Sequence, residues 1–188
     1  AEGLLSQSGG FYGNGAEALI LDVADVENLF NTTLDLATKT VRDAITHNRG
    51  IIRCNPEALS CADIILDEFA PRAWRRPLTQ EERSELHDLF VGIAEDWQDS
   101  GRAATHLVHA ILLSPHFIYR PEIDLDLESA TPRNLNGYEL ASRLSYFLWA
   151  SMPDAELFSK AGDGSLLSDV ELRKQVERML NDPKSQAL

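Results

Sequence analysis

The segment Phe69-Ala-Pro-Arg-Ala-Trp-Arg-Arg-Pro-Leu-Thr79 is the most informative stretch of this 188-residue chain. It places three arginines and a tryptophan between two prolines, in a chain whose formal net charge is −13. A guanidinium group is costly to desolvate unless it is paired, so we expect carboxylates or backbone carbonyls close to this cluster. The segment also lies where one helical pattern stops and another begins.

The residues that follow the segment predict the clearest helix of the chain. Thr79-Gln-Glu-Glu82 is a capping box, in which the side chains of Thr79 and Glu82 satisfy each other's backbone N–H groups. Apolar residues then recur at steps of three and four, which is typical of a helix with one buried face. The predicted buried stripe is Leu86, Leu89, Phe90, Ile93 and Trp97.

The residues before the segment predict two more helices. Helical periodicity runs from about Asp25 to His47, and Asn48-Arg-Gly50 supplies the stop. Ser60 is placed to cap a helix that ends near Arg76. The first 16 residues are rich in Gly and Ser and predict irregular chain, and residues 18–23 show weak strand-like alternation.

The second half of the chain is also predicted to be helical, so the predicted fold class is all-α. A break at Ser100-Gly101 precedes a helix that ends near Leu113. Helices are expected after Asn136-Gly-Tyr-Glu139, at Ser151-Met-Pro-Asp154, after the capping box Ser168-Asp-Val-Glu171, and from Asp182-Pro183.

Changes in composition predict the domain organisation. We expect an irregular segment at 1–24 that ends a preceding domain, a helical domain at 25–120, an acidic linker at 121–135 and a second helical domain that starts at 136. Because a helix start at Asp182-Pro183 is an unusual place for a domain to end, we expect further residues in the natural polypeptide.

The two cysteines, Cys54 and Cys61, are predicted to form a disulfide. Asn55-Pro56 supplies a turn that can bring them together. Two cysteines do not complete a zinc site, and the sequence contains neither Cys-x-x-Cys nor the haem-attachment pattern Cys-x-x-Cys-His. A disulfide would imply an oxidising compartment.

Composition also limits the partners of the chain. The sequence pI of about 4.7 disfavours nucleic acid, because an acidic surface repels phosphates. No apolar run approaches the roughly 18 residues that a transmembrane helix needs, so no transmembrane segment is expected.

Three long motifs carry a resemblance to a family. They are Phe69–Glu82, Leu112–Arg120 and Glu139–Asp154, the last followed by 176–183. They resemble domains of unknown function that occur together in large secreted proteins of the planctomycete and myxobacterial cytochrome-c-associated type, and residues 10–28 are weakly similar to a third such domain. The resemblance implies an extracytoplasmic location and association with a redox system, with haem c in a partner domain. It supplies no catalytic residues.

Three histidines and three acidic residues are candidate metal ligands. His106 and His109 stand three residues apart on a predicted helix, and His116 could complete a three-histidine site if it folded back. The alternative is that all three are structural. Asp124, Asp126 and Glu128 resemble the first ligands of an EF-hand, but the required Gly is missing and Leu135 replaces the final Glu. A solvated acidic linker is the better interpretation.

The arginines of the opening segment, Arg72, Arg75 and Arg76, allow two interpretations. They could join the helical segments by pairing with carboxylates such as Glu139 or Asp154, or they could bind an anionic ligand or a haem propionate of a partner domain. The aromatic residues nearby leave a similar choice between a redox relay and core packing. They are Trp74, Tyr146 and Trp149.

These observations predict the helical, non-haem part of a secreted or periplasmic multi-domain protein that works with a cytochrome c-type redox system. Its partners would be the remaining domains of the same polypeptide and a cytochrome or other oxidoreductase subunit. Two alternatives stay open. One is a metal-dependent or oxidoreductase enzyme whose site is completed by another chain or domain, and the other is a structural or adhesion module.

Overall fold

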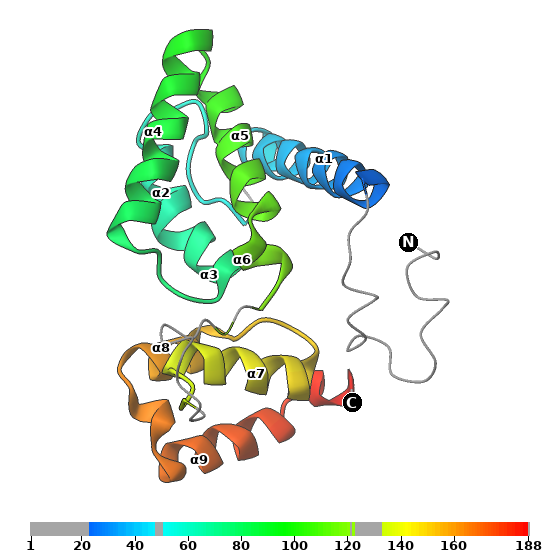
Figure 1. Ribbon diagram of the computed structural model, residues 1–188, viewed down its shortest axis with the longest axis vertical. Coiled ribbons are helices and arrows are strands. Elements are labelled where there is room, and N and C mark those ends of the chain that lie inside the picture. Colours follow the sequence, from blue (N-terminus) through cyan, green and yellow to red (C-terminus); the bar gives the residue numbers. More distant parts are fainter. Residues whose placement is uncertain (1–22, 48–50, 121, 123–132, 188) are drawn as a thin grey trace.

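The computed structural model describes residues 23–47, 51–120, 122 and 133–187, which form helices joined by turns. None of these described residues lies in a strand, so the predicted all-α fold class is confirmed. The predicted irregular segment at 1–24 and the weak strand at 18–23 lie outside the described residues, except for Val23 and Ala24, which begin a helix and not irregular chain or a strand. Most of the acidic linker also lies outside the described residues. Two helical units are visible, one above the other in Figure 1.

The first unit is built around one central helix, α5 (Ser100–Leu113), which packs against both α1 (Val23–His47) and α4 (Gln80–Trp97). Ala103 and Ala104 on α5 are fully buried, and their small side chains allow neighbouring helices to approach closely. The remaining elements of this unit are α2 (Cys61–Ile64), η2 (Ile65–Phe69), α3 (Ala70–Trp74) and α6 (Pro115–Ile118).

The helix that runs into the segment Phe69–Thr79 contains a π-helical turn that was not predicted. Elements α2, η2 and α3 follow one another without a break, and η2 is a π-helical turn in which the Ala70 N–H donates to the carbonyl of Ile65. Pro71 explains the wide turn, because it has no N–H for an α-helical bond and its ring would clash with the preceding turn. Ser60 precedes α2, but its side chain makes no capping hydrogen bond, which corrects the prediction.

Helix α4 begins at the predicted capping box, but fewer of its apolar side chains are buried than predicted. The capping box of Thr79 and Glu82 is present with both hydrogen bonds. Of the predicted stripe, only Phe90 is fully buried, and Trp97 is 58% exposed because it lies past the end of the core, under the guanidinium of Arg102 at 3.6 Å. The break after α4 falls at Gln98 and Asp99, so Ser100 and Gly101 begin α5 and do not separate the helices.

The second unit has its own core. It comprises α7 (Gly137–Trp149), α8 (Ala155–Gly162), η3 (Ser165–Leu167), α9 (Asp169–Leu180) and η4 (Pro183–Ala187). Gly137 is required where α7 meets α8, because a Cβ there would lie 2.4 Å from the carbonyl oxygen of Ala161. The core residues are Ala141, Leu148, Trp149, Leu157, Ala161, Leu166 and Met179.

Several details of the second unit differ from the prediction. Asp154 is the N-cap of α8, so Pro153 lies before the helix. Helical spacing beside Leu144 and Leu148 predicts that Phe147 is buried, but it is 72% exposed. The polar Gln175 is fully buried, because Glu156, Glu171 and Arg178 satisfy its amide. The predicted final helix is the short 3₁₀ element η4.

The predicted disulfide is present. Cys54 and Cys61 are bonded, with their Cα atoms 5.4 Å apart, and they close the loop that leads into α2. None of the helices in the described ranges is both long and apolar enough to cross a membrane.

We expect loss of the disulfide to destabilise the first unit. The variant Cys54→Ala/Cys61→Ala should have a free energy of unfolding about 2.5 kcal/mol lower, because the open loop adds conformational entropy to the unfolded chain. Urea unfolding of the variant and of the wild type, with and without reductant, measures this difference. Equal midpoints for oxidised and reduced wild type would contradict it.

Candidate functional site

The candidate site is the arginine junction, which we define as Arg75 and Arg76 with the groups that they contact on α4, α6 and α7. Arg75 follows α3 and has a φ of 60°, a left-handed conformation that is uncommon for a residue with a side chain. This conformation ends α3 immediately after Trp74. Arg75 is only 6% exposed, so the junction contains a buried positive charge.

Backbone carbonyls satisfy the buried guanidinium of Arg75. Its Nη2 donates to the carbonyl oxygens of His116, Phe117 and Tyr119, at 2.5, 3.2 and 2.5 Å. These carbonyls lie at the C-terminal end of α6, where a helix leaves carbonyls without intrahelical partners and where positive charge is favourable. Arg75 therefore fixes the point at which the first unit ends.

Arg76 forms a second, more exposed cluster beside Arg75. Its two terminal nitrogens donate to the two oxygens of Glu82 at 2.8 and 2.6 Å, and its guanidinium carbon lies 5.5 Å from the centre of the Trp74 ring. The Glu82 carboxylate also accepts the backbone N–H of Thr79. One carboxylate thus joins the arginine segment to the start of α4.

His116 completes this cluster. Its Nε2 lies 3.5 Å from Glu82, and its ring centre lies 4.9 Å from that of Trp74. The bidentate bond from Arg76 lowers the pKa of Glu82, against the opposing effect of burial. Burial, followed by the charge of Arg76, lowers the pKa of His116. The arrangement favours a charged Glu82 beside a neutral His116.

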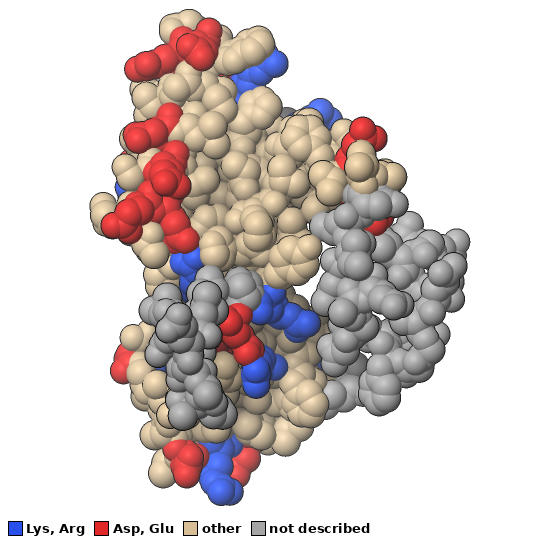
Figure 2. Space-filling view, in the orientation of Figure 1, with Lys and Arg blue, Asp and Glu red and all other residues tan. Residues whose placement is uncertain are grey.

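Contacts at the junction also reach the second unit. Tyr146 on α7 carries two guanidinium groups near its ring, with Arg120 at 4.7 Å and Arg75 at 5.9 Å from the ring centre. Arg143 on α7 pairs with Glu122, which follows the first unit in sequence. Figure 2 shows basic side chains between the two units, below an acidic face of the first unit.

The buried tryptophans belong to the cores. The indole N–H of Trp74 donates to the carbonyl of Ile111 at 3.0 Å, which ties α3 to α5. In the second unit, Trp149 donates to the carbonyl of Met179 at 3.0 Å, and Arg178 and Lys184 lie over its ring. These contacts support the core-packing interpretation of the two tryptophans.

The predicted carboxylate partners of the arginines are corrected. Glu139 pairs with Arg133, and Asp154 pairs with Arg178, so neither reaches the junction. Arg72 is exposed and pairs with no carboxylate in the described part of the chain. Anion binding by the three predicted arginines stays a prediction.

Sequence reasoning missed Arg133, which repeats the geometry of Arg76. Each arginine lies six residues before a capping-box glutamate, forms a bidentate pair with it, and donates to the carbonyl of the next residue, Pro77 or Asn134. The shared pattern is Arg-x-Leu-(Thr/Asn)-x-x-Glu, at 76–82 and 133–139. This spacing was the signal that could have identified the pairs.

The three predicted histidine ligands occupy different surroundings. His109 packs edge-on against Phe30 of α1, whereas His116 belongs to the cluster with Arg76. His106 lies close enough to His109 to affect its pKa. Among the residues that the structure describes, no group of three or more His, Cys, Asp or Glu side chains could hold a metal ion. A three-histidine site stays a prediction without geometric support.

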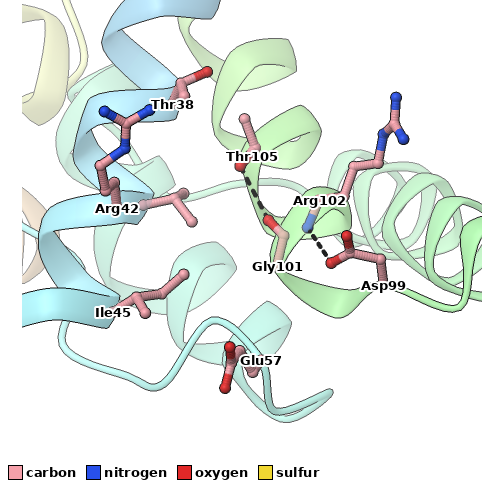
Figure 3. A pocket seen from close by; sticks show the side chains of 9 residues that line it. Thr38, Arg42, Ile45, Glu57, Asp99, Gly101, Arg102 and Thr105 are labelled. Atoms are coloured by element: carbon pink, nitrogen blue, oxygen red, sulfur yellow. Dashed lines mark hydrogen bonds between the residues drawn. The ribbon is translucent and has the colours of Figure 1, made fainter.

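A pocket of about 330 Å³ lies away from the junction, between α1, the cysteine loop and the start of α5 (Figure 3). Its polar groups serve the helices: Asp99 accepts the N–H of Arg102, and the Thr105 hydroxyl donates to the carbonyl of Gly101. Arginines and carboxylates are mixed in its lining, so its charge favours no single class of ligand. The lining residues are Thr38, Val41, Arg42, Ile45, Glu57, Asp99, Gly101, Arg102 and Thr105.

Two parts of the chain match known protein families. The molecule is an all-α protein with two helical units joined at an arginine junction. Residues 61–122 match the family PSD5, described as a protein of unknown function (DUF1595), and residues 135–188 match the family PSD4, described as a protein of unknown function (DUF1592). The first match contains the arginine junction of the first unit, and the second contains α7 to α9. Comparisons with curated proteins and with solved structures gave no match.

We expect the Arg76–Glu82 pair to make stability depend on acid pH. The pKa of folded Glu82 lies below its ordinary value of 4.5, so the pair stabilises the fold above that pH, and this contribution is lost as the pH falls through the folded pKa. At pH 7, Glu82→Gln should lower the free energy of unfolding by about 2 kcal/mol, the usual cost of losing a charged hydrogen bond.

Urea unfolding between pH 7 and pH 3 tests this pair. The stability of Glu82→Gln should fall less steeply with acid than that of the wild type. Glu81→Gln is the matched control, because Glu81 is the exposed neighbour on α4 and should behave as the wild type does. Parallel curves for wild type and Glu82→Gln would show that the pair does not contribute.

Proposed function

We propose that this chain is the helical, non-haem scaffold of a larger extracytoplasmic protein that works with a cytochrome c-type redox system. Its contribution is packing between domains and docking of partners. The observation that carries the proposal is the pair of contacts made by Arg75. Its buried guanidinium donates to carbonyls at the end of α6 in the first unit and also faces the ring of Tyr146 in the second unit.

The junction is suited to joining domains with some freedom. A guanidinium over an aromatic ring contributes about 0.5–2 kcal/mol, depending on how dry the contact is. Two such contacts on Tyr146 therefore favour one arrangement of the units without locking it. Domains that meet through small, polar contacts move relative to each other unless further contacts hold them. Additional domains or partners would supply those contacts.

Exposed apolar side chains support a docking role. On α1, Val23 is 78% exposed and Val26 is 50% exposed, and in the second unit Phe147 and Val170 are 72% and 81% exposed. Large apolar side chains in contact with water are candidates for burial against a partner when they gather on one surface. Both units carry such residues, which supports contacts with more than one neighbouring domain.

Two observations support the proposed location and redox association. The disulfide between Cys54 and Cys61 suits an oxidising compartment, as is usual for secreted and periplasmic proteins. The motifs at 69–82, 112–120 and 139–154 resemble domains of secreted, cytochrome-c-associated proteins, and the matched families are themselves of unknown function.

We expect Tyr146→Leu to uncouple the two units. Leucine keeps apolar volume on α7 but removes the aromatic ring that both guanidinium groups face, so the coupling energy between the units should fall by about 1–2 kcal/mol. Differential scanning calorimetry should then show the units unfolding more independently than in the wild type. Phe147→Leu is the control, because its exposed neighbouring ring faces no described cation. Identical thermograms for Tyr146→Leu and wild type would contradict a coupling role.

The redox association has its own test. The chain purified in its natural complex, without overexpression, should carry the absorption bands of c-type haem, contributed by a partner domain or subunit. Spectra of the reduced and oxidised complex, together with mass spectrometry of its components, measure this. A complex that contains this chain and no haem protein would refute the association and would favour a structural or adhesion module.

A further inference from the structure

The outer face of α7 presents an aromatic side chain to water. Ala141 and Leu148 lie on the opposite face of this helix, in the core of the second unit. Tyr146 and Phe147 follow Arg143 by three and four residues, so the three side chains share the outer face. Phe147 is 72% exposed, which makes it the most exposed aromatic side chain of the described ranges. Arginines and aromatic rings are both enriched at surfaces that bind another protein.

Arg120, at the end of the first unit, adds a charged group to this face. Its guanidinium lies over the ring of Tyr146, at 4.7 Å from the ring centre. The side chain is exposed, and it pairs with no carboxylate among the described residues. Contact with a ring uses the flat face of a guanidinium and leaves the N–H donors at its edge available. The ring therefore holds Arg120 in a position where its donors can bind a carboxylate.

Arg143 shows how this face binds a carboxylate. Its Nε and Nη2 donate to the two oxygens of Glu122. Its Nη1 has no acceptor within the described part of the chain, and the Arg143 side chain is 61% exposed. Arg143 therefore keeps donors for a second carboxylate while it holds the first. Because one helical turn separates Arg143 from Tyr146, the free donors of Arg143 and of Arg120 belong to one surface.

The charge and shape of this surface, which we call the α7 outer patch, define its complement. The patch consists of Arg120, Arg143, Tyr146 and Phe147. Figure 2 shows basic side chains between the two units, separate from the acidic side chains over α4. Guanidinium groups bind carboxylates through two parallel hydrogen bonds, and an exposed phenylalanine ring is covered favourably by an apolar side chain. A segment that carries carboxylates next to an apolar side chain matches both halves of the patch.

We propose that the α7 outer patch docks an acidic segment of a partner protein, in which carboxylates pair with Arg120 and Arg143 and a neighbouring apolar side chain covers Phe147. The inference rests on the docking role proposed above and names the chemistry of one partner, and it does not depend on haem. The net charge of −13 does not attract such a segment from a distance, so recognition comes from contact. At physiological salt the Debye length of about 8 Å screens most of the repulsion from distant carboxylates.

Nuclear magnetic resonance of the whole isotope-labelled chain, titrated with a synthetic peptide in about 0.15 M salt, tests this contact. The probe is Gly-Glu-Glu-Leu-Glu-Glu-Leu-Gly with blocked ends, and the control peptide has Gln in place of every Glu. The acidic peptide should shift the side-chain Nε–H signal of Arg120 and the backbone amides of residues 143–150, and it should leave the amides of α4 unchanged. The Gln peptide should bind about tenfold more weakly, because a neutral amide forms weaker hydrogen bonds with a guanidinium.

Variants assign the binding to the patch. Arg120→Gln should weaken binding of the acidic peptide about tenfold, and Arg120→Lys should weaken it less, because an ammonium group keeps the charge but not the two parallel bonds. Phe147→Ser should weaken binding several-fold through the lost apolar contact. Arg173→Gln is the matched control, because it removes the same charge from an exposed arginine of α9, outside the patch.

Three results would each refute the docking of an acidic segment. They are a lack of binding of the acidic peptide at millimolar concentration, equal binding of the Glu and Gln peptides, and equal weakening by Arg173→Gln and Arg120→Gln. If the natural complex nevertheless contains c-type haem, the proposed redox association stands and only the acidic contact fails. If the peptide binds at the patch and the complex lacks haem, the contact stands and the redox association fails.

Discussion

The structure depends on the burial of one guanidinium group that has no carboxylate partner among the described residues. Arg75 is 6% exposed, and it is compensated by the carbonyls at the end of α6 and by the ring of Tyr146. A buried charge must be solvated by fixed dipoles if no counter-charge is available. This requirement fixes three things at once: α3 ends at Trp74 in a left-handed turn, α6 ends where its carbonyls can reach Arg75, and the chain leaves the first unit beside α7.

Both units bury a tryptophan at the end of a helix through similar contacts. Each has a helix that ends on a buried tryptophan followed by a left-handed residue, Arg75 in one unit and Ala150 in the other. In both, the indole N–H bonds a carbonyl of a packed helix, and an arginine covers the ring at 5.5 Å while pairing with an acid at the start of the following helix. A tryptophan brings a large apolar area and one obligatory donor, so it sets both the spacing and the register of its neighbours. The arginine then covers the ring face and pairs with a carboxylate that takes part in the cap of the next helix.

Local features could be predicted from the sequence, and features that depend on distant contacts could not. The capping boxes at Thr79 and Asn136 involve residues three apart, so their hydrogen bonds follow from the sequence itself. The partners of Arg75 are carbonyls more than forty residues away, and a carbonyl has no side chain to mark it. Periodicity misplaced Trp97 and gave no sign that Gln175 is buried, because it assigns a face to a helix without showing where the core ends or which polar group finds buried partners. The π-helical turn at η2 was accessible in principle, since Pro71 lies inside an otherwise helical run.

The internal use of arginines also determines what the outer surface can attract. Arg76, Arg133 and Arg178 are committed to carboxylates that cap helices, and Arg75 is buried, so these positive charges project little field into solvent. The chain carries a formal net charge of −13, and acidic side chains cover the α4 face of the first unit in Figure 2. Such a surface steers cationic partners toward the protein and repels anionic ones over about a Debye length. Junction and surface are therefore two consequences of one distribution of charge: arginines organise the interior contacts, and the excess of carboxylates faces the solvent, where a partner with basic surface residues would be favoured.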